Sequence, residues 1–72
     1  MAEMQRELNR LAGTTGLDAQ GAANVWAGTT QKDLLGALNA KNSTTGLGLN
    51  AVCNALAGTS QKEAQAALAS IP

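Results

Sequence analysis

Apolar residues along the chain recur at positions i, i+3, i+4 and i+7 of short segments, which is the spacing of one face of an α-helix. The pattern restarts every 15 residues, and its five sets are Met4, Glu7, Leu8 and Leu11; Ala19, Ala22, Ala23 and Trp26; Leu34, Ala37, Leu38 and Lys41; Leu49, Val52, Cys53 and Leu56; and Ala64, Ala67, Leu68 and Ile71. Only Glu7 and Lys41 are charged. The spacing predicts five short helices, at residues 2–12, 16–27, 31–41, 46–57 and 61–71.

The residues that end and connect these segments repeat with the same period. Asparagine, glycine or serine, and threonine each recur 15 residues apart, at Asn9, Asn24, Asn39 and Asn54; Gly13, Gly28, Ser43 and Gly58; and Thr14, Thr29, Thr44 and Thr59. Alternate turns are most alike, since residues 15–17 match 45–47 and residues 31–32 match 61–62. The full repeat is therefore a 30-residue pair of helices.

Short connections force helices that follow one another to pack together. We therefore expect an all-α fold, a compact helical array or bundle, with residues 1–72 forming a single helical-repeat domain. The pattern is compatible with an open superhelix and with a closed bundle.

The turns carry the signature of helix caps, a hydroxyl residue followed three positions later by an acid. Three pairs fit this capping box: Thr15 with Asp18, Thr30 with Asp33, and Ser60 with Glu63. The equivalent turn ends in Gly48 in place of an acid, which predicts a weaker cap. Small residues also recur at one helical position, at Gly21, Gly36, Ala51 and Ala66, where we expect close helix crossings.

The composition excludes several classes of function. The chain has no His and one Cys, so the commonest general base and metal ligand is missing and no internal disulfide can form. Its formal net charge is zero, without the basic surface that holds phosphate backbones. We expect no enzyme activity, no catalytic, cofactor-binding or metal-binding residue, no small-molecule substrate and no nucleic-acid partner.

Membrane and secretory signals are also missing from the sequence. No apolar run approaches the ~18 residues of a membrane span, and residues 1–7 lack the apolar stretch of a signal peptide. We expect no membrane partner, and synthesis in the cytoplasm.

Several residues allow two interpretations. Trp26 is either a core anchor between helices or an anchor at an interface with a partner. The periodic asparagines either bond to the turn backbone or form a ladder of exposed amides that recognises a repeating partner. The charges between Glu3 and Arg10 are either a solvated face with ion pairs or a docking face. For Cys53 we expect a small buried thiol.

The turn module resembles a known family of repeats. Residues 11–18, 23–30, 35–39 and 52–59 resemble the LAGTTGL and AANxxAGTTG repeats of small structural proteins and protein termini of tailed bacteriophages that infect actinobacteria. The chain departs from that spelling at residues 31–32, 41–43 and 61–62.

The resemblance implies a virion component, made in the host cytoplasm. Our leading hypothesis is a minor capsid or decoration protein that docks on the major capsid protein or other virion proteins, with self-association also open. One alternative is a tail or baseplate accessory protein. Another is a cytoplasmic helical-repeat adaptor that binds a protein and never enters a virion.

Overall fold

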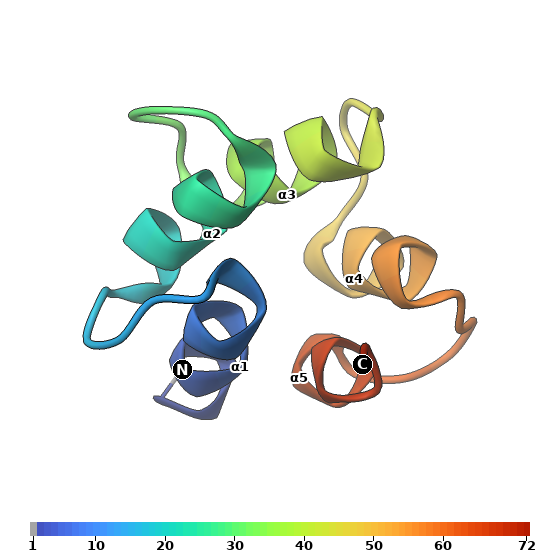
Figure 1. Cartoon of the computed structure of the whole chain (residues 1–72). Helices are drawn as coiled ribbons and strands as arrows, with labels where there is room; N and C mark the ends of the chain where they lie inside the picture. Colours follow the sequence, from blue (N-terminus) through green and yellow to red (C-terminus); the bar gives the residue numbers. More distant parts are fainter. Residues whose placement is uncertain (1) are drawn as a thin grey trace.

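The computed structural model describes residues 2–72, which form five helices and no strand (Figure 1). The helices are α1 (Ala2–Ala12), α2 (Ala19–Ala27), α3 (Leu34–Asn42), α4 (Leu49–Ala57) and α5 (Ala64–Ala69). The predicted all-α fold with five helices is confirmed.

The helices close into a ring around one core. Each helix contacts the next in sequence, and α1 also contacts α5, so that the first and last helices lie side by side (Figure 1). The molecule measures 28 × 22 × 19 Å. Of the two arrangements that the sequence leaves open, the closed bundle is therefore the one adopted.

The centre of the ring is filled by the i+4 residue of every helix. These fully buried residues are Leu8, Ala23, Leu38, Cys53 and Leu68. Leucine comes from α1, α3 and α5, and a smaller side chain comes from α2 and α4, so large and small residues alternate from α1 to α5, and two leucines meet where the ring closes. Such alternation lets side chains interdigitate at native packing density.

The charged residue in the apolar pattern of α3 has a specific partner. The Nζ atom of Lys41 lies 5.2 Å from the ring centroid of Trp26, the equivalent residue of α2. Trp26 is itself partly buried and packs against the core. The exposed lysine therefore covers the tryptophan ring through a cation–π contact at a position where the other helices after α1 have an apolar residue.

The helices after α1 begin three residues later than the sequence pattern predicts, and the residues assigned as caps are corrected accordingly. The N-cap residues are Asp18, Asp33, Gly48 and Glu63, and the hydroxyl residues Thr15, Thr30 and Ser60 lie outside the helices.

Two features of the turns keep these hydroxyl residues out of the helices. The residue after Thr15 and Thr30, Gly16 and Gln31 respectively, has φ of 77° and 61°, which is incompatible with a right-handed helix. After Ser60, the N–H and C=O of Lys62 both bond to the side chain of Asn54, which holds this segment in the turn.

Among the four helices after α1, the N-cap residue's own side chain makes the cap bond in two. Oδ1 of Asp18 accepts from the N–H of Gly21, and Oδ1 of Asp33 accepts from that of Gly36, both at 2.7 Å. Glu63 makes no such bond. The N–H of Ala64 donates instead to Oδ1 of Asn50 at 2.9 Å, so a side chain of the preceding helix caps α5.

The glycines at the third position of α2 and α3 make room for these caps. A Cβ atom on Gly21 would lie 3.0 Å from Oδ1 of Asp18, and one on Gly36 would lie 2.7 Å from Oδ1 of Asp33. The expectation that these glycines permit close helix crossings is therefore wrong, because the nearest neighbour is the capping carboxylate of the same repeat.

Candidate docking surface

The turns are held by four asparagines that are only 5–8% exposed. Around Asn24, Nδ2 donates to the carbonyl oxygens of Gln20 at 2.8 Å and Lys32 at 2.9 Å. Its Oδ1 accepts from Oγ1 of Thr29 at 2.7 Å and from the N–H of Lys32 at 3.2 Å. We call this set of four bonds the asparagine clamp.

The same clamp occurs around the other three periodic asparagines, Asn9, Asn39 and Asn54. Each amide is thereby fully used within the protein. The interpretation of these residues as hydrogen-bonding to the turn backbone is confirmed, and the alternative of an exposed amide ladder is wrong.

Each helix before a turn also ends in a Schellman motif. At the end of α2, the N–H of Thr29 donates to the carbonyl of Asn24 at 3.0 Å, and the N–H of Gly28 donates to that of Val25 at 3.3 Å. Gly28 has φ of 74°, where glycine carries no steric cost. Clamp and motif together fix the backbone of each turn at both of its ends.

Two open hollows lie beside these turns, with volumes of about 450 and 430 Å³. The first is lined by α1 and its turn up to Gly16, and the second by α3 and its turn up to Gly46, so the two occupy equivalent places 30 residues apart. Residues 14–16 and 44–46 have the same sequence. One wall of each hollow is therefore formed by a turn of identical sequence.

The helical walls make the two hollows chemically different. Arg6 and Arg10 line the first hollow, where the second has Gly36 and Ala40. Leu35 lines the second hollow and is 37% exposed, although the equivalent residue of every other helix carries a side-chain amide. Two arginines therefore line the first hollow, whereas the second has an apolar wall beside one acid and one base, Asp33 and Lys32.

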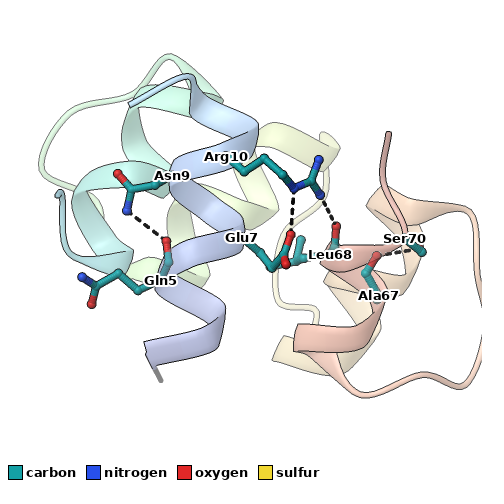
Figure 2. A network of polar contacts seen from close by, with 7 residues as sticks. All are labelled: Gln5, Glu7, Asn9, Arg10, Ala67, Leu68 and Ser70. Carbon is teal, nitrogen blue, oxygen red and sulfur yellow. Dashed lines mark hydrogen bonds and ion pairs between the residues drawn. The ribbon is translucent and has the colours of Figure 1, made fainter. Parts of the chain in front are cut away.

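One polar network joins the first and last helices (Figure 2). Nε of Arg10 donates to Oε1 of Glu7 at 2.8 Å, and its Nη2 donates to the carbonyl oxygen of Leu68 at 3.1 Å. The ion pair of Glu7 with Arg10 agrees with the sequence prediction. The bond from α1 to α5 was not predicted, since a backbone carbonyl has no signature in the sequence.

The thiol of Cys53 is not accessible at the surface. Cys53 is fully buried, and desolvation raises the pKa of its thiol to about 11, so the thiol stays protonated at neutral pH. Among residues 2–72 no three His, Cys, Asp or Glu residues are grouped so that they could hold a metal ion. None of the helices of this part of the chain has the length and hydropathy needed to cross a bilayer.

Trp26 and its neighbour differ in exposure. Trp26 is partly buried against the core, whereas Val25 is 51% exposed. The first interpretation of Trp26, a core anchor between helices, agrees with this packing. Its role as an interface anchor stays a prediction.

Comparison of the chain with protein-family models, with characterised proteins and with solved structures found no match.

Proposed function

We propose that this protein is a non-enzymatic structural protein of a tailed-bacteriophage virion, most specifically a minor capsid or decoration protein that docks on the capsid shell through its clamped turns. The observation that carries the proposal is the asparagine clamp at all four turns, with a hollow beside two of them. A surface whose backbone is already fixed loses little conformational entropy when a partner covers it.

The chemistry of the surface supports a docking role. Only 14% of the residues are charged, so covering the surface desolvates few ions. Cys53 is buried and the chain has no His, which supports a role without catalysis. The resemblance of the turn module to phage structural repeats supports the virion as the setting.

The test is to measure the copy number of this chain in purified virions of the phage that encodes it. Mass spectrometry with isotope-labelled peptide standards gives its molar ratio to the major capsid protein. A decoration protein on symmetric sites should show a ratio near one or a simple fraction of it. Host protein of similar abundance, quantified in the same sample, controls for carry-over from the lysate.

The other outcomes select the other hypotheses. A handful of copies per particle would contradict docking over the shell and favour a tail or baseplate accessory protein. A chain that is abundant in infected cells and absent from particles would overturn the virion proposal and favour the cytoplasmic adaptor.

A further inference from the structure

We infer that the first hollow binds a carboxylate of the partner protein, an aspartate or glutamate side chain. This inference deepens the proposed docking function by naming the chemistry of the partner. It starts from Arg6 and Arg10, which are one helical turn apart on α1 and both line the hollow. No acidic side chain lines it, whereas the second hollow is lined by one acid and one base, Asp33 and Lys32.

The two arginines have different roles. Arg10 is held in place, because Nε bonds to Glu7 and Nη2 bonds to the carbonyl of Leu68. A guanidinium has five N–H donors, so these two bonds leave Arg10 with further donors. Arg6 is exposed and takes no part in the ion pair between Glu7 and Arg10. Arg6 is therefore the cation available to an incoming carboxylate, and Arg10, whose charge is paired with Glu7, adds prepositioned N–H donors.

The opposite wall of the hollow is rigid. Thr14 and Leu17, on either side of Thr15 and Gly16, are both bonded to Oδ1 of Asn9. A ligand that enters between α1 and this turn does not have to order the backbone.

The charge distribution favours a single carboxylate over a polyanion. The chain has a net charge of zero, and a nucleic acid needs many cations along its backbone. The planar guanidinium matches the two oxygens of a carboxylate with two parallel hydrogen bonds.

The experiment is a titration of the isotope-labelled full chain with an acetylated and amidated tripeptide, Ala-Glu-Ala, which carries one carboxylate, followed by the amide resonances. The two hollows provide an internal control, because Thr15 and Gly16 recur as Thr45 and Gly46 beside a hollow without arginine, whose one lysine, Lys32, is balanced by Asp33. We expect concentration-dependent shifts at Thr15 and Gly16 that fit a single weak site, because an exposed charge pair contributes little binding free energy. The shifts at Thr45 and Gly46 should be at least fivefold smaller.

Variants separate the arginine from general electrostatics. Arg6→Gln should weaken binding at least fivefold, and Lys62→Gln, which removes an equal but distant charge, should leave it unchanged. Raising the salt concentration from 0.05 to 0.5 M, as an experimental condition, should also weaken binding several-fold. Circular dichroism checks that both variants remain helical.

Three results would overturn the inference: equal shifts at both hollows, binding that survives Arg6→Gln, or no shifts at all. Inorganic phosphate that binds the same amides as tightly as the tripeptide would show a general anion site and overturn the carboxylate assignment. These results leave the copy number in virions unaffected, so this inference and the proposed function fail independently.

Discussion

The two ends of the helices in this repeat follow different rules. The carboxyl ends of α1, α2, α3 and α4 share one arrangement, with an asparagine clamp, a threonine and a left-handed residue. The amino ends differ: Asp18 and Asp33 cap their helices, Gly48 has no side chain, and α5 is capped by Asn50. The repeat tolerates variation at the start of a helix and keeps its end constant.

The number of bonds explains this difference. An N-cap side chain satisfies one backbone donor that water can also satisfy, since the cap is exposed. The clamp makes four bonds in a buried setting, two of which join the last turns of one helix to the segment before the next helix. An unsatisfied partner there costs about 1–3 kcal/mol. The clamp therefore determines the backbone path of each turn, whereas the cap only changes the stability of the helix that follows.

The largest effect is expected for Asn39→Asp, which keeps the shape of the side chain and removes its donors. A carboxylate would face the carbonyl oxygens of Leu35 and Leu47, which now accept from Nδ2 at 3.0 and 3.1 Å. We expect a loss of about 3 kcal/mol in the free energy of unfolding at pH 7, measured by urea denaturation.

This variant should also acquire a pH dependence. Burial beside two carbonyls raises the folded-state pKa of the new carboxyl above its unfolded value. The stability is then highest below the unfolded pKa, near pH 4, and is lost as the pH rises through the folded pKa. Gln20→Glu, an exposed amide-to-acid change, is the control and should alter stability by less than about 0.5 kcal/mol. Equal losses in both variants would contradict the special role of the clamp.

A smaller loss is expected at the amino ends. Asp33→Ala removes the acceptor for the N–H of Gly36 and should cost about 1 kcal/mol, or about 4–8 °C in Tm for a domain of this size. Glu63→Ala is the matched control, because Glu63 makes no cap bond. A Tm loss for Glu63→Ala as large as that for Asp33→Ala would show that charge near the helix end, not the cap bond, sets the stability.

The faces of the helices could be read from the sequence, whereas their amino ends could not. The period of 15 residues places Leu8, Leu38 and Leu68 in the core, where the structure has them. The pairing of Thr15 with Asp18 fits a capping box, and it equally fits a turn that ends in an aspartate cap. What decides between the two is the bond from Asn9 to Leu17, across eight residues, and no local pattern contains that contact.

The candidate site depends even more on three-dimensional placement. The repeat shows that residues 14–16 and 44–46 are equivalent, but only the folded turn shows that each forms the wall of a hollow. Ring closure is similarly hidden, because the bond from Arg10 to the carbonyl of Leu68 joins residues 58 positions apart.

The carboxyl end of α3 departs from the common arrangement, and a substitution there should stabilise the protein. Ser43 occupies the left-handed position with φ of 59°, where its counterparts are glycine. Ser43→Gly should relieve about 1 kcal/mol of backbone strain and lose part of this gain through the greater freedom of the unfolded chain. We expect a net increase of about 0.5 kcal/mol in the free energy of unfolding, measured by thermal unfolding. The reverse change, Gly28→Ser, should be destabilising, and a gain there would contradict the argument.

The smallest effect concerns the coupling between an aspartate cap and the glycine three residues later. Gly48→Asp should gain only a few tenths of a kcal/mol, because Ala51 stands where Gly21 and Gly36 leave room for the carboxylate. Ala51→Gly alone should cost up to about 1 kcal/mol in helix propensity. In the double variant the cap can form freely, so a double-mutant cycle should give a favourable coupling of about 0.5 kcal/mol. Strict additivity would show that the pairing of aspartate with glycine in α2 and α3 has no energetic cause.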